Sequence, residues 1–592
     1  MKRCVRGLFT YLCLAYACAG AWAFNGDLGS AIFVDTVTGA DANPGTLAQP
    51  KATIAGALSI ATPGKNIYVS KGTYTEAVQM MSGVSLYGQY DQASNWTQDA
   101  ANTTIIDGSS NPVSFSNVSG ETHFERFQVQ AANAAIGVSS YAVRVDASSG
   151  PIFIRYNTLL AGSGGPGQNA GAGGVGSDGG DGNNGAAGTC DANAGGIGGI
   201  AGTSACNPGG KGGNGGYGPS SGANGQTGGG GTLAGPGGGS GDPGGPGSSG
   251  SAGSAGTSGA NATPSVSSVG SIVAGLYTPV LTTPGGSGAD GNGGGGGGGG
   301  GGQHSFLVID GTGNGGGSGG GAGCGAAAGG SGDGGGGSFA LFISTSIVTV
   351  DANYLVVGPA GTGGNGGDGA AGGVGGARGL GGLICTSEVG AGGNGGKGGK
   401  GGSSGGGAGG PGGPAVAIFG TSGSVTIGTN RYSLPSAAPA GTGGTGGGVG
   451  QGQAGSGPAG VVQHGYPNDF GDPGPPTLAI ADASILMPYS GTNFVAVPVA
   501  LTPITNDVVG VHYQTFDGSA VAGTNYTAMS GDLSLAPWAT GQTIRIPILG
   551  ASGSPKTFSV QLSAPTNAGI STFAATVTIT YDGDVIFRSG FE

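Results

Sequence analysis

The sequence predicts an all-β chain of stacked coils, followed by a β-sandwich. One strand–turn–strand unit occurs three times, as "AVRVDASSGPIFIRYN" (142–157), "ALFISTSIVTVDAN" (340–353) and "AIFGTSGSVTIGTN" (417–430). Such a repeat is typical of a solenoid, in which each coil buries its apolar face on the next. From about residue 475, short alternating strands return at regular spacing, which is typical of a sandwich.

The closing asparagines of these units are Asn157, Asn353 and Asn430. We interpret them as structural rather than catalytic. Asparagine tolerates the left-handed backbone conformation needed at coil corners, and side-chain amides can stack in ladders.

A glycine-rich run follows each of these asparagines, and glycine accounts for 149 of the 592 residues. The runs begin "LLAGSGGPGQNAGAGG", "LVVGPAGTGGNGGDG" and "SLPSAAPAGTGGTGGG". We therefore expect residues 161–460 to contain inserts that leave the coil stack at one corner and return in register. Further coils are predicted at 338–358 and 415–434.

The glycine runs have a period of three, as in "GGNGGKGGKGG" (392–402). That period matches an extended left-handed helix with three residues per turn, the polyglycine-II form. Ordering costs about 1–2 kcal/mol per residue, whereas a backbone hydrogen bond contributes only about 1 kcal/mol net, so one tract alone should not order. Tracts packed side by side, with backbones in contact, are favoured; flexible loops are the alternative.

Charge and composition narrow the function classes. Only 8% of residues are charged and the formal net charge is −12. A low charge favours packed backbone over a solvated linker. Without a basic patch to neutralise phosphates, the chain is not expected to bind nucleic acid.

Residues 1–23 have the features of a signal peptide. A basic start and an apolar run precede Ala21, Trp22 and Ala23, which form a small-x-small cleavage pattern. Lipidation of Cys18 is an alternative processing route. No later segment has the length and apolarity of a membrane helix. We expect an exported protein, extracellular or on the outer surface of a bacterium.

Four cysteines follow the predicted leader, and an even number in an exported chain suggests disulfides. Cys190 and Cys206 lie within one insert, so we expect them to pair. Cys324 and Cys385 then remain for a second bond. A metal site is not expected, because the spacings are wide and His304 is the only histidine nearby.

Residues 24–160 begin with a characteristic order of elements. A strand at 32–34 leads through "TGADANPGT" to the short helix "QPKATIAGALSIA", which Pro63 and Gly64 end. "NIYVSKGTYTE" and "VSLYGQYD" then follow as the first coil strands. With this order of features, residues 24–160 resemble the start of the right-handed parallel β-helices of the pectin-lyase-like superfamily. The superfamily includes lyases, hydrolases, adhesins and inert spikes, so the resemblance implies a fold and not an activity.

After a predicted linker at 461–474, the chain contains the pieces "DGSAVAGTNY" (517–526), "SGDL" (530–533) and "TIRIPILG". On these pieces, residues 475–585 resemble a Calx-β domain, an immunoglobulin-like sandwich. The final "DGDVIFRSGFE", which includes the predicted tail 586–592, resembles the short tails of many exported bacterial proteins. A tag for export or attachment and a frayed end both remain open for this tail.

Family members that bind calcium use clustered carboxylates at one end of the sandwich, and calcium needs six to eight oxygens. This chain keeps Asp517, Asp582 and Asp584 as weak candidates. Asn525 stands where the resemblance implies an aspartate, and Lys556 brings positive charge to an acidic stretch. The sandwich is therefore expected to act as a spacer or contact module, with no cofactor assigned.

Acidic and basic residues on the predicted coils are scattered: Asp107, Glu121, Glu125, Asp146, Asp351, Arg126, Arg144, Arg155 and Arg431. No spacing among them places two carboxylates on adjacent coils of one face, as a glycoside hydrolase needs. We therefore predict a non-catalytic surface or matrix protein of structural or adhesion type. Its expected partner is a cell-surface polymer, a polysaccharide, a protein or itself. The alternatives are a polysaccharide lyase or glycoside hydrolase and a calcium-dependent adhesion module.

Overall fold

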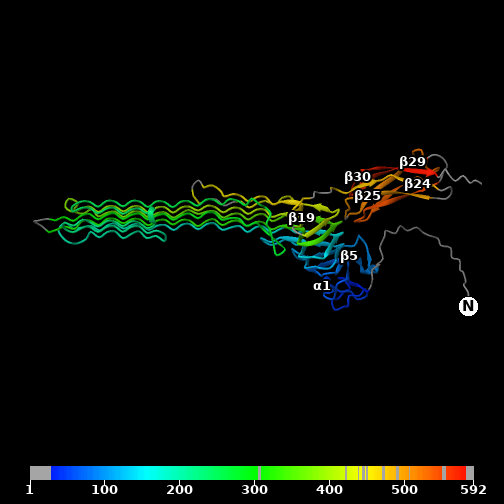
Figure 1. Cartoon of the computed structure of the whole chain (residues 1–592), viewed down its shortest axis with the longest axis horizontal. Helices are drawn as coiled ribbons and strands as arrows, with labels where there is room; N and C mark the ends of the chain where they lie inside the picture. The colour runs from blue at the N-terminus through cyan, green and yellow to red at the C-terminus, as the bar shows by residue number, and fades with distance from the viewer. Residues whose placement is uncertain are drawn as a thin grey trace, which may run out of the picture.

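The structure is a computed structural model that describes residues 29–304, 309–420, 423–437, 439–442, 447–448, 451–469, 474–487, 493–505, 507–549 and 555–581. Figure 1 shows three parts: a coiled β-domain, a long bundle of glycine-rich tracts that projects from it, and a β-sandwich. The predicted all-β fold class is confirmed.

The coiled domain is a parallel β-helix, in which each complete coil gives one strand to each of three sheets. Sheet 1 contains β1 (Ala31–Val34), β2 (Asn66–Ser70), β5 (Ser85–Asp91), β9 (Thr122–Glu125), β12 (Pro151–Arg155), β17 (Ser346–Asp351) and β20 (Gly423–Ile427), with β6 (Thr97–Gln98) beside β5. Sheet 2 contains β3 (Gly72–Thr75), β7 (Thr104–Asp107), β10 (Gln128–Gln130), β13 (Thr158–Leu160), β18 (Tyr354–Val356) and β21 (Arg431–Ser433). Sheet 3 contains β4 (Val78–Met80), β8 (Val113–Ser116), β11 (Ser140–Asp146), β16 (Ser338–Ser344), β19 (Ala415–Gly420) and β22 (Val462–Tyr466).

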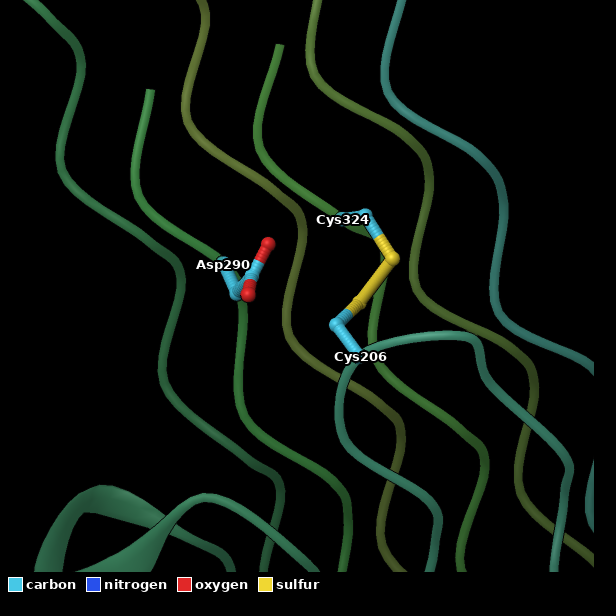
Figure 2. Close-up of side chains that lie close together, drawn as sticks. All are labelled: Cys206, Asp290 and Cys324. Atoms are coloured by element: carbon cyan, nitrogen blue, oxygen red, sulfur yellow. A yellow bond between two sulfur atoms is a disulfide. The ribbon is translucent and has the colours of Figure 1, made fainter. Parts of the chain in front are cut away.

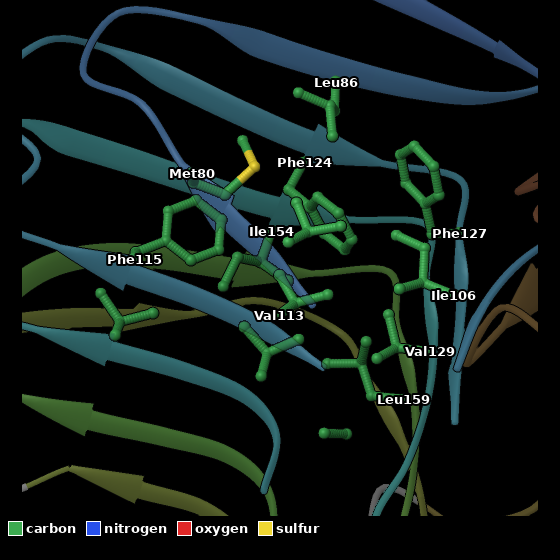
Figure 3. Close-up of a cluster of buried hydrophobic side chains, with 14 of the residues drawn as sticks. Met80, Leu86, Ile106, Val113, Phe115, Phe124, Phe127, Val129, Ile154 and Leu159 are labelled. Carbon is green, nitrogen blue, oxygen red and sulfur yellow. The ribbon is translucent and has the colours of Figure 1, made fainter. Parts of the chain in front are cut away.

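Inward-pointing apolar side chains of the three sheets form one core. Phe115 from sheet 3, Phe124 from sheet 1 and Val129 from sheet 2 are all fully buried within it (Figure 3). Burial of each such side chain contributes about 1.5–3 kcal/mol. Stacking of coils therefore stabilises the β-helix, as the repeat predicts.

One short helix, α1 (Ile54–Leu58), packs against the first strands. It is shorter than the predicted segment, and its first backbone N–H groups are held by side chains. Gly56 donates to the Thr53 hydroxyl at 2.9 Å, and Ile54 and Ala55 donate to the Glu76 carboxylate, each at 2.8 Å. These bonds satisfy N–H groups that a helix start leaves without partners.

The corner between sheets 1 and 2 carries the predicted asparagine ladder. Asn157 donates through Nδ2 to Asn353 Oδ1 at 3.1 Å, and Asn353 donates in the same way to Asn430 at 3.0 Å. All three are buried. The left-handed conformation, expected at the asparagines, lies one residue earlier, at Tyr156 (φ 58°) and Ala352 (φ 58°).

Each glycine insert leaves after a sheet 2 strand and returns at the next sheet 3 strand, as predicted. One detail differs from the expectation. Residues 462–466, expected in a linker, form β22 and pair in parallel with β19. Within the first insert, β14 (Ser271–Val273) and β15 (Leu276–Thr278) form an antiparallel hairpin.

The sandwich consists of two sheets around a second core. One has the order β28 (Gly541–Ile548), β25 (Asn493–Thr502), β23 (Thr477–Ile480) and β30 (Gly569–Thr572). The other has the order β24 (Ala483–Met487), β31 (Ala574–Tyr581), β29 (Lys556–Thr566), β26 (Val509–Phe516) and β27 (Ser530–Leu535). Strand β25 alternates buried and exposed residues along its length, as expected for a strand with one face in the core.

Candidate functional site

The glycine bundle is held together by backbone hydrogen bonds between tracts. The run Gly293–Gly302 lies at its centre, and all ten residues are buried. Every one of their N–H groups donates to a neighbouring tract, at distances from 2.7 to 3.0 Å. The acceptors alternate with a period of three among residues 220–229, 314–320 and 245–251. The predicted three-residue period is therefore a hydrogen-bonding period.

Glycine is required in this run because the tracts touch through their backbones. A Cβ atom on Gly297 would lie 2.1 Å from the carbonyl oxygen of Gly393, and one on Gly298 would lie 2.0 Å from that of Gly239. Neither gap admits a side chain. In the middle of the bundle all three positions of the repeat face other tracts, which explains why G-G-x becomes G-G-G there.

On the surface, the third position of the repeat faces outward. Every third residue of the 359–383 tract is exposed: Thr362, Asn365, Asp368, Ala371, Val374, Ala377, Leu380 and Leu383. Their backbone N–H groups also point away from the bundle interior. Several are satisfied by side chains of the adjacent 163–188 tract, for example Val374 by Asp178 Oδ1 at 2.7 Å and Leu380 by Asn184 Oδ1 at 2.8 Å. Asparagine and aspartate side chains thus satisfy backbone N–H groups at the surface of the bundle.

Two disulfides cross the bundle, and the predicted pairing is wrong. Cys190 is bonded to Cys385, and Cys206 to Cys324, each with Cα atoms 5.7 Å apart. Cys190 and Cys385 join two different inserts, whereas Cys206 and Cys324 join two tracts of the single insert between β13 and β16. All four cysteines are nevertheless in disulfides.

Cys206, Asp290 and Cys324 bring a carboxylate and two sulfur atoms within 4.8 Å of one another (Figure 2). Both sulfurs are used in the disulfide, so they are not thiolates that could ligate a metal. The Asp290 carboxylate instead accepts a hydrogen bond from the Gly325 N–H at 2.9 Å. This cluster is a structural crosslink.

On the outer face of sheet 1, charges of opposite sign alternate from coil to coil. The strand register places Glu125 beside Arg155, and Arg155 beside Asp351. Arg155 stacks on the Phe153 ring at 4.5 Å. Two carboxylates of this row are therefore two coils apart, with a guanidinium between them, which agrees with the expectation that adjacent coils would not pair carboxylates.

His123 lies between aromatic rings and carboxylates on the same face. Its ring stacks on Phe153 at 4.6 Å, while Nδ1 and Nε2 lie 3.1 Å from Glu125 and Glu121, respectively. Tyr87 lies on the other side, and burial together with the Glu125 charge raises the pKa of Tyr87 to about 12. Glu121, Glu125 and Arg155 stand out separately in the sequence, but His123 does not, because only the coil register brings it into the row.

The hairpin β14–β15 covers an aromatic column on the outer face of sheet 3. Phe342, Phe419 and Tyr466 are stacked, with ring centroids 5.0 and 4.7 Å apart. The Tyr277 N–H donates to the Tyr141 hydroxyl at 3.1 Å. Arg144, another coil residue singled out above, donates to the Gly275 carbonyl at 3.3 Å.

The sandwich packs on the asparagine corner of the β-helix. Ile504 and Trp538 from the sandwich bury Ala352, and Arg431 Nη1 lies 3.3 Å from Asp507. Cavities of about 240 and 520 Å³ remain along this junction. Polar and apolar side chains both line these cavities, and no cluster of catalytic groups lies among the lining residues. The first cavity is lined by Tyr156, Asp351, Ala352, Thr429, Leu501, Thr502, Ile504 and Thr540. The second is lined by Asp99, Ala100, Ala101, Val508, Ser534, Leu535, Ala536, Pro537, Ala539, Gly541 and Gln542.

Of the calcium candidates, Asp517 lies in a tight turn. Its Oδ1 accepts from the Tyr526 hydroxyl at 2.7 Å and from the Ala522 N–H at 2.8 Å. Lys556 reaches the same turn and donates to the Ser519 carbonyl. Asp582 and Asp584 lie outside the described residues, as do the predicted signal peptide and the carboxy-terminal tail.

A family match supports the assignment of the sandwich. Residues 488–583 match the family described as Calx-beta domain, and residues 37–194 match a family described as protein of unknown function (DUF1565). The chain is similar to the Apo-form Calx CBD1 domain (26% identity, 18% of this chain and 99% of that one) and to calcium binding domain CBD12 of CALX1.1 (24%, 18% and 45%). Both superpositions have a TM-score of 0.16. A comparison with curated proteins finds no match.

The chain therefore carries a Calx-β domain at its carboxy-terminal end. None of the helices in the described part of the chain has the length and apolarity needed to cross a membrane.

Proposed function

We propose that this chain is a non-catalytic, exported structural or adhesion-type protein of the cell surface or matrix. In this proposal, the β-helix is a rigid base, the glycine bundle is a stiff projection that presents an outer surface, and the Calx-β domain is a spacer or contact module. Expected partners are a cell-surface polymer, a protein or a second copy. Disulfides suit an oxidising compartment.

The observation that carries this proposal is that every backbone N–H group of Gly293–Gly302 donates a hydrogen bond. Because each N–H has a partner in another tract, the bundle is a packed body rather than a set of loops. A packed projection can hold a surface at a fixed distance from its base, whereas loops cannot.

The proposal can be tested with cells that display the chain on their surface and carry one of two glycine substitutions. Gly298→Val places a side chain against the Gly239 carbonyl, whereas Gly239→Val adds one where nothing lies within 4 Å. We expect Gly298→Val to abolish attachment of the displaying cells to surfaces or to one another, and Gly239→Val to preserve it. Equal attachment by both variants would contradict the proposed role of the bundle.

A second candidate is activity on a polysaccharide, favoured by the row of Tyr87, His123 and Phe153 with Glu125 on sheet 1. Aromatic rings provide apolar faces on which sugar rings can stack, and the pectin-lyase-like superfamily that the first coils resemble includes such enzymes. Screening acidic and neutral glycans for products, with Glu125→Gln as the control, tests this candidate. Product formed only by the unaltered chain would favour it over the structural proposal.

A further inference from the structure

Three outer rows of side chains run next to one another on the distal half of the bundle. The middle row belongs to the 359–383 tract. On one side lies the 163–188 tract, whose Gly179 N–H donates to the Val374 carbonyl at 2.8 Å. On the other side lies the 390–413 tract, whose Gly395 N–H donates to the Gly379 carbonyl at 2.9 Å. We call this surface the three-row face.

Hydrogen bonds fix which residues of the three rows lie at the same height. The Asp178 and Asp181 carboxylates accept from the N–H groups of Val374 and Ala377, both at 2.7 Å. The hydrogen bonds from Gly395 to Gly379 and from Gly398 to Gly376 fix the heights of the residues in the row of the 390–413 tract. We call three residues at the same height a level. The four levels are Asp178, Val374 and Lys400; Asp181, Ala377 and Lys397; Asn184, Leu380 and Asn394; and Ala187, Leu383 and Ala391.

The charge of the side chains changes sign from one edge of the three-row face to the other. At the levels from Val374 to Leu383, Asp178 and Asp181 lie on one edge and Lys397 and Lys400 on the other, with the exposed middle row between them. Val374, Leu380 and Leu383 are 61%, 50% and 73% exposed. No ion pair within the described residues involves Lys397, Lys400, Asp178 or Asp181. Arg378 is also exposed and has the same repeat position as Gly375 and Gly381, where an added Cβ would meet the 390–413 tract. Its positive charge therefore lies on the lysine side.

We propose that the three-row face binds the same face of a second copy, through a two-fold axis parallel to the tracts and centred on the middle row. Such an axis exchanges the two edges without changing the height of any level. Lys400 of each copy then meets Asp178 of the other, and Lys397 meets Asp181. Leu380 and Leu383 meet their own counterparts, as a self-complementary two-fold interface requires.

The charges of the two edges favour a parallel dimer over an antiparallel one. A two-fold axis across the tracts would place lysines over lysines and acids over acids, which is repulsive. Levels repeat about every 9 Å, from three residues at about 3.1 Å each, so both ion pairs form together. Near the base, residues 439–442 and 455–458 cover the neighbouring rows, since Gly363 donates to Pro439 and Gly409 to Gly455. The interface is therefore confined to the distal half.

Sedimentation equilibrium of the purified, disulfide-bonded chain tests this interface. We expect a dimer that weakens with salt. Lys397→Glu with Lys400→Glu should weaken it on the order of tenfold or more. Asp178→Asn with Asp181→Asn keeps an oxygen to accept the N–H groups of Val374 and Ala377. This pair should weaken the unaltered dimer but strengthen the dimer of the glutamate variant, because there it removes repulsion.

Crosslinking provides an independent readout of symmetry. Ala377→Cys lies on the proposed axis, so a short bis-maleimide should join two copies through it, whereas Ser249→Cys, exposed on the 245–262 tract, should not be joined. A chain that is monomeric at all concentrations, or a dimer indifferent to these charge changes, would overturn the proposal. A monomer that binds dextran sulfate through Lys397 and Lys400 would overturn it in favour of an acidic polymer.

This inference deepens the surface role proposed above by naming a partner. The two can fail separately. A monomeric chain whose glycine core is protected from exchange rejects the dimer alone, whereas an unprotected core rejects both.

Discussion

Cys190 is bonded to Cys385, and the offset of 195 residues between them is also the offset of the hydrogen bonds in the tracts that precede them. Gly179 donates to Val374, and Gly185 donates to Leu380; both differences, 374 − 179 and 380 − 185, equal 195. The disulfide therefore fixes the register in which the two outgoing tracts lie side by side.

Removal of this disulfide should loosen the distal end of the bundle. In the chain-entropy description, a closed loop of this length stabilises the fold by about 5 kcal/mol. We expect Cys190→Ser with Cys385→Ser to increase amide exchange at Gly185 while leaving Gly167 protected. The pair Cys206→Ser and Cys324→Ser is the control, because it should release the segment around Gly202 and Gly209. The same exchange pattern in both variants would contradict register-specific crosslinking.

Adding one methyl group should have opposite effects at two glycines. Gly297→Ala places its Cβ 2.1 Å from the Gly393 oxygen and should destabilise the chain by about 1–3 kcal/mol, as overpacking does. Gly171→Ala meets nothing within 4 Å and should stabilise it by about 0.4–1 kcal/mol, because alanine has less freedom in the unfolded chain. Denaturant unfolding of the bundle checks both. Equal effects would mean that the tracts are not in backbone contact.

The asparagine ladder should contribute strongly to the β-helix. Asn353 accepts from Asn157 and donates to Asn430 and to the Ile154 carbonyl at 2.8 Å, all while buried. Asn353→Ala removes the acceptor of the buried Asn157 backbone N–H and the side-chain donor to the Ile154 carbonyl, so we expect a loss of about 2–4 kcal/mol in the free energy of unfolding. Thr349→Ala, on the outward face of the same strand β17, should change it little. A small loss at Asn353 would show that water replaces the ladder.

High pH should detach the hairpin β14–β15. Burial raises the pKa of Tyr277 from its ordinary value of 10 to about 12. Because the folded state has the higher pKa, the stabilisation is complete below about pH 10 and is lost as the pH rises through about 12. Tyrosinate absorbance of the chain and of Tyr277→Phe identifies this ionisation, and amide exchange of residues 271–273 reports the release. Release of the hairpin well below pH 10 would contradict this assignment.

Much of the fold could be predicted because local patterns in the amino-acid sequence specify it. The repeated unit before Asn157, Asn353 and Asn430 predicts the coils, and the three-residue glycine period predicts polyglycine helices. The Calx-β domain follows from "DGSAVAGTNY" and its alternating strands. These features depend on residues close together in the sequence.

What could not be predicted depends on neighbours that are far apart in the sequence. A glycine tract pairs with others through backbone groups that are identical at every residue, so its partners are not specified locally. For this reason the pairing of Cys190 with Cys385 was missed. The row that joins Glu125 to Arg155 and Asp351, and the levels of the three-row face, also require the register between distant segments.

Amide hydrogen exchange of Gly293–Gly302 in the disulfide-bonded chain tests the central claim most directly. If each of these N–H groups donates to a neighbouring tract, all ten should be strongly protected, and Gly297→Ala should reduce their protection while Gly171→Ala does not. Exchange as fast as in a free glycine peptide would show that the tracts are not packed, and the rigid projection would be rejected.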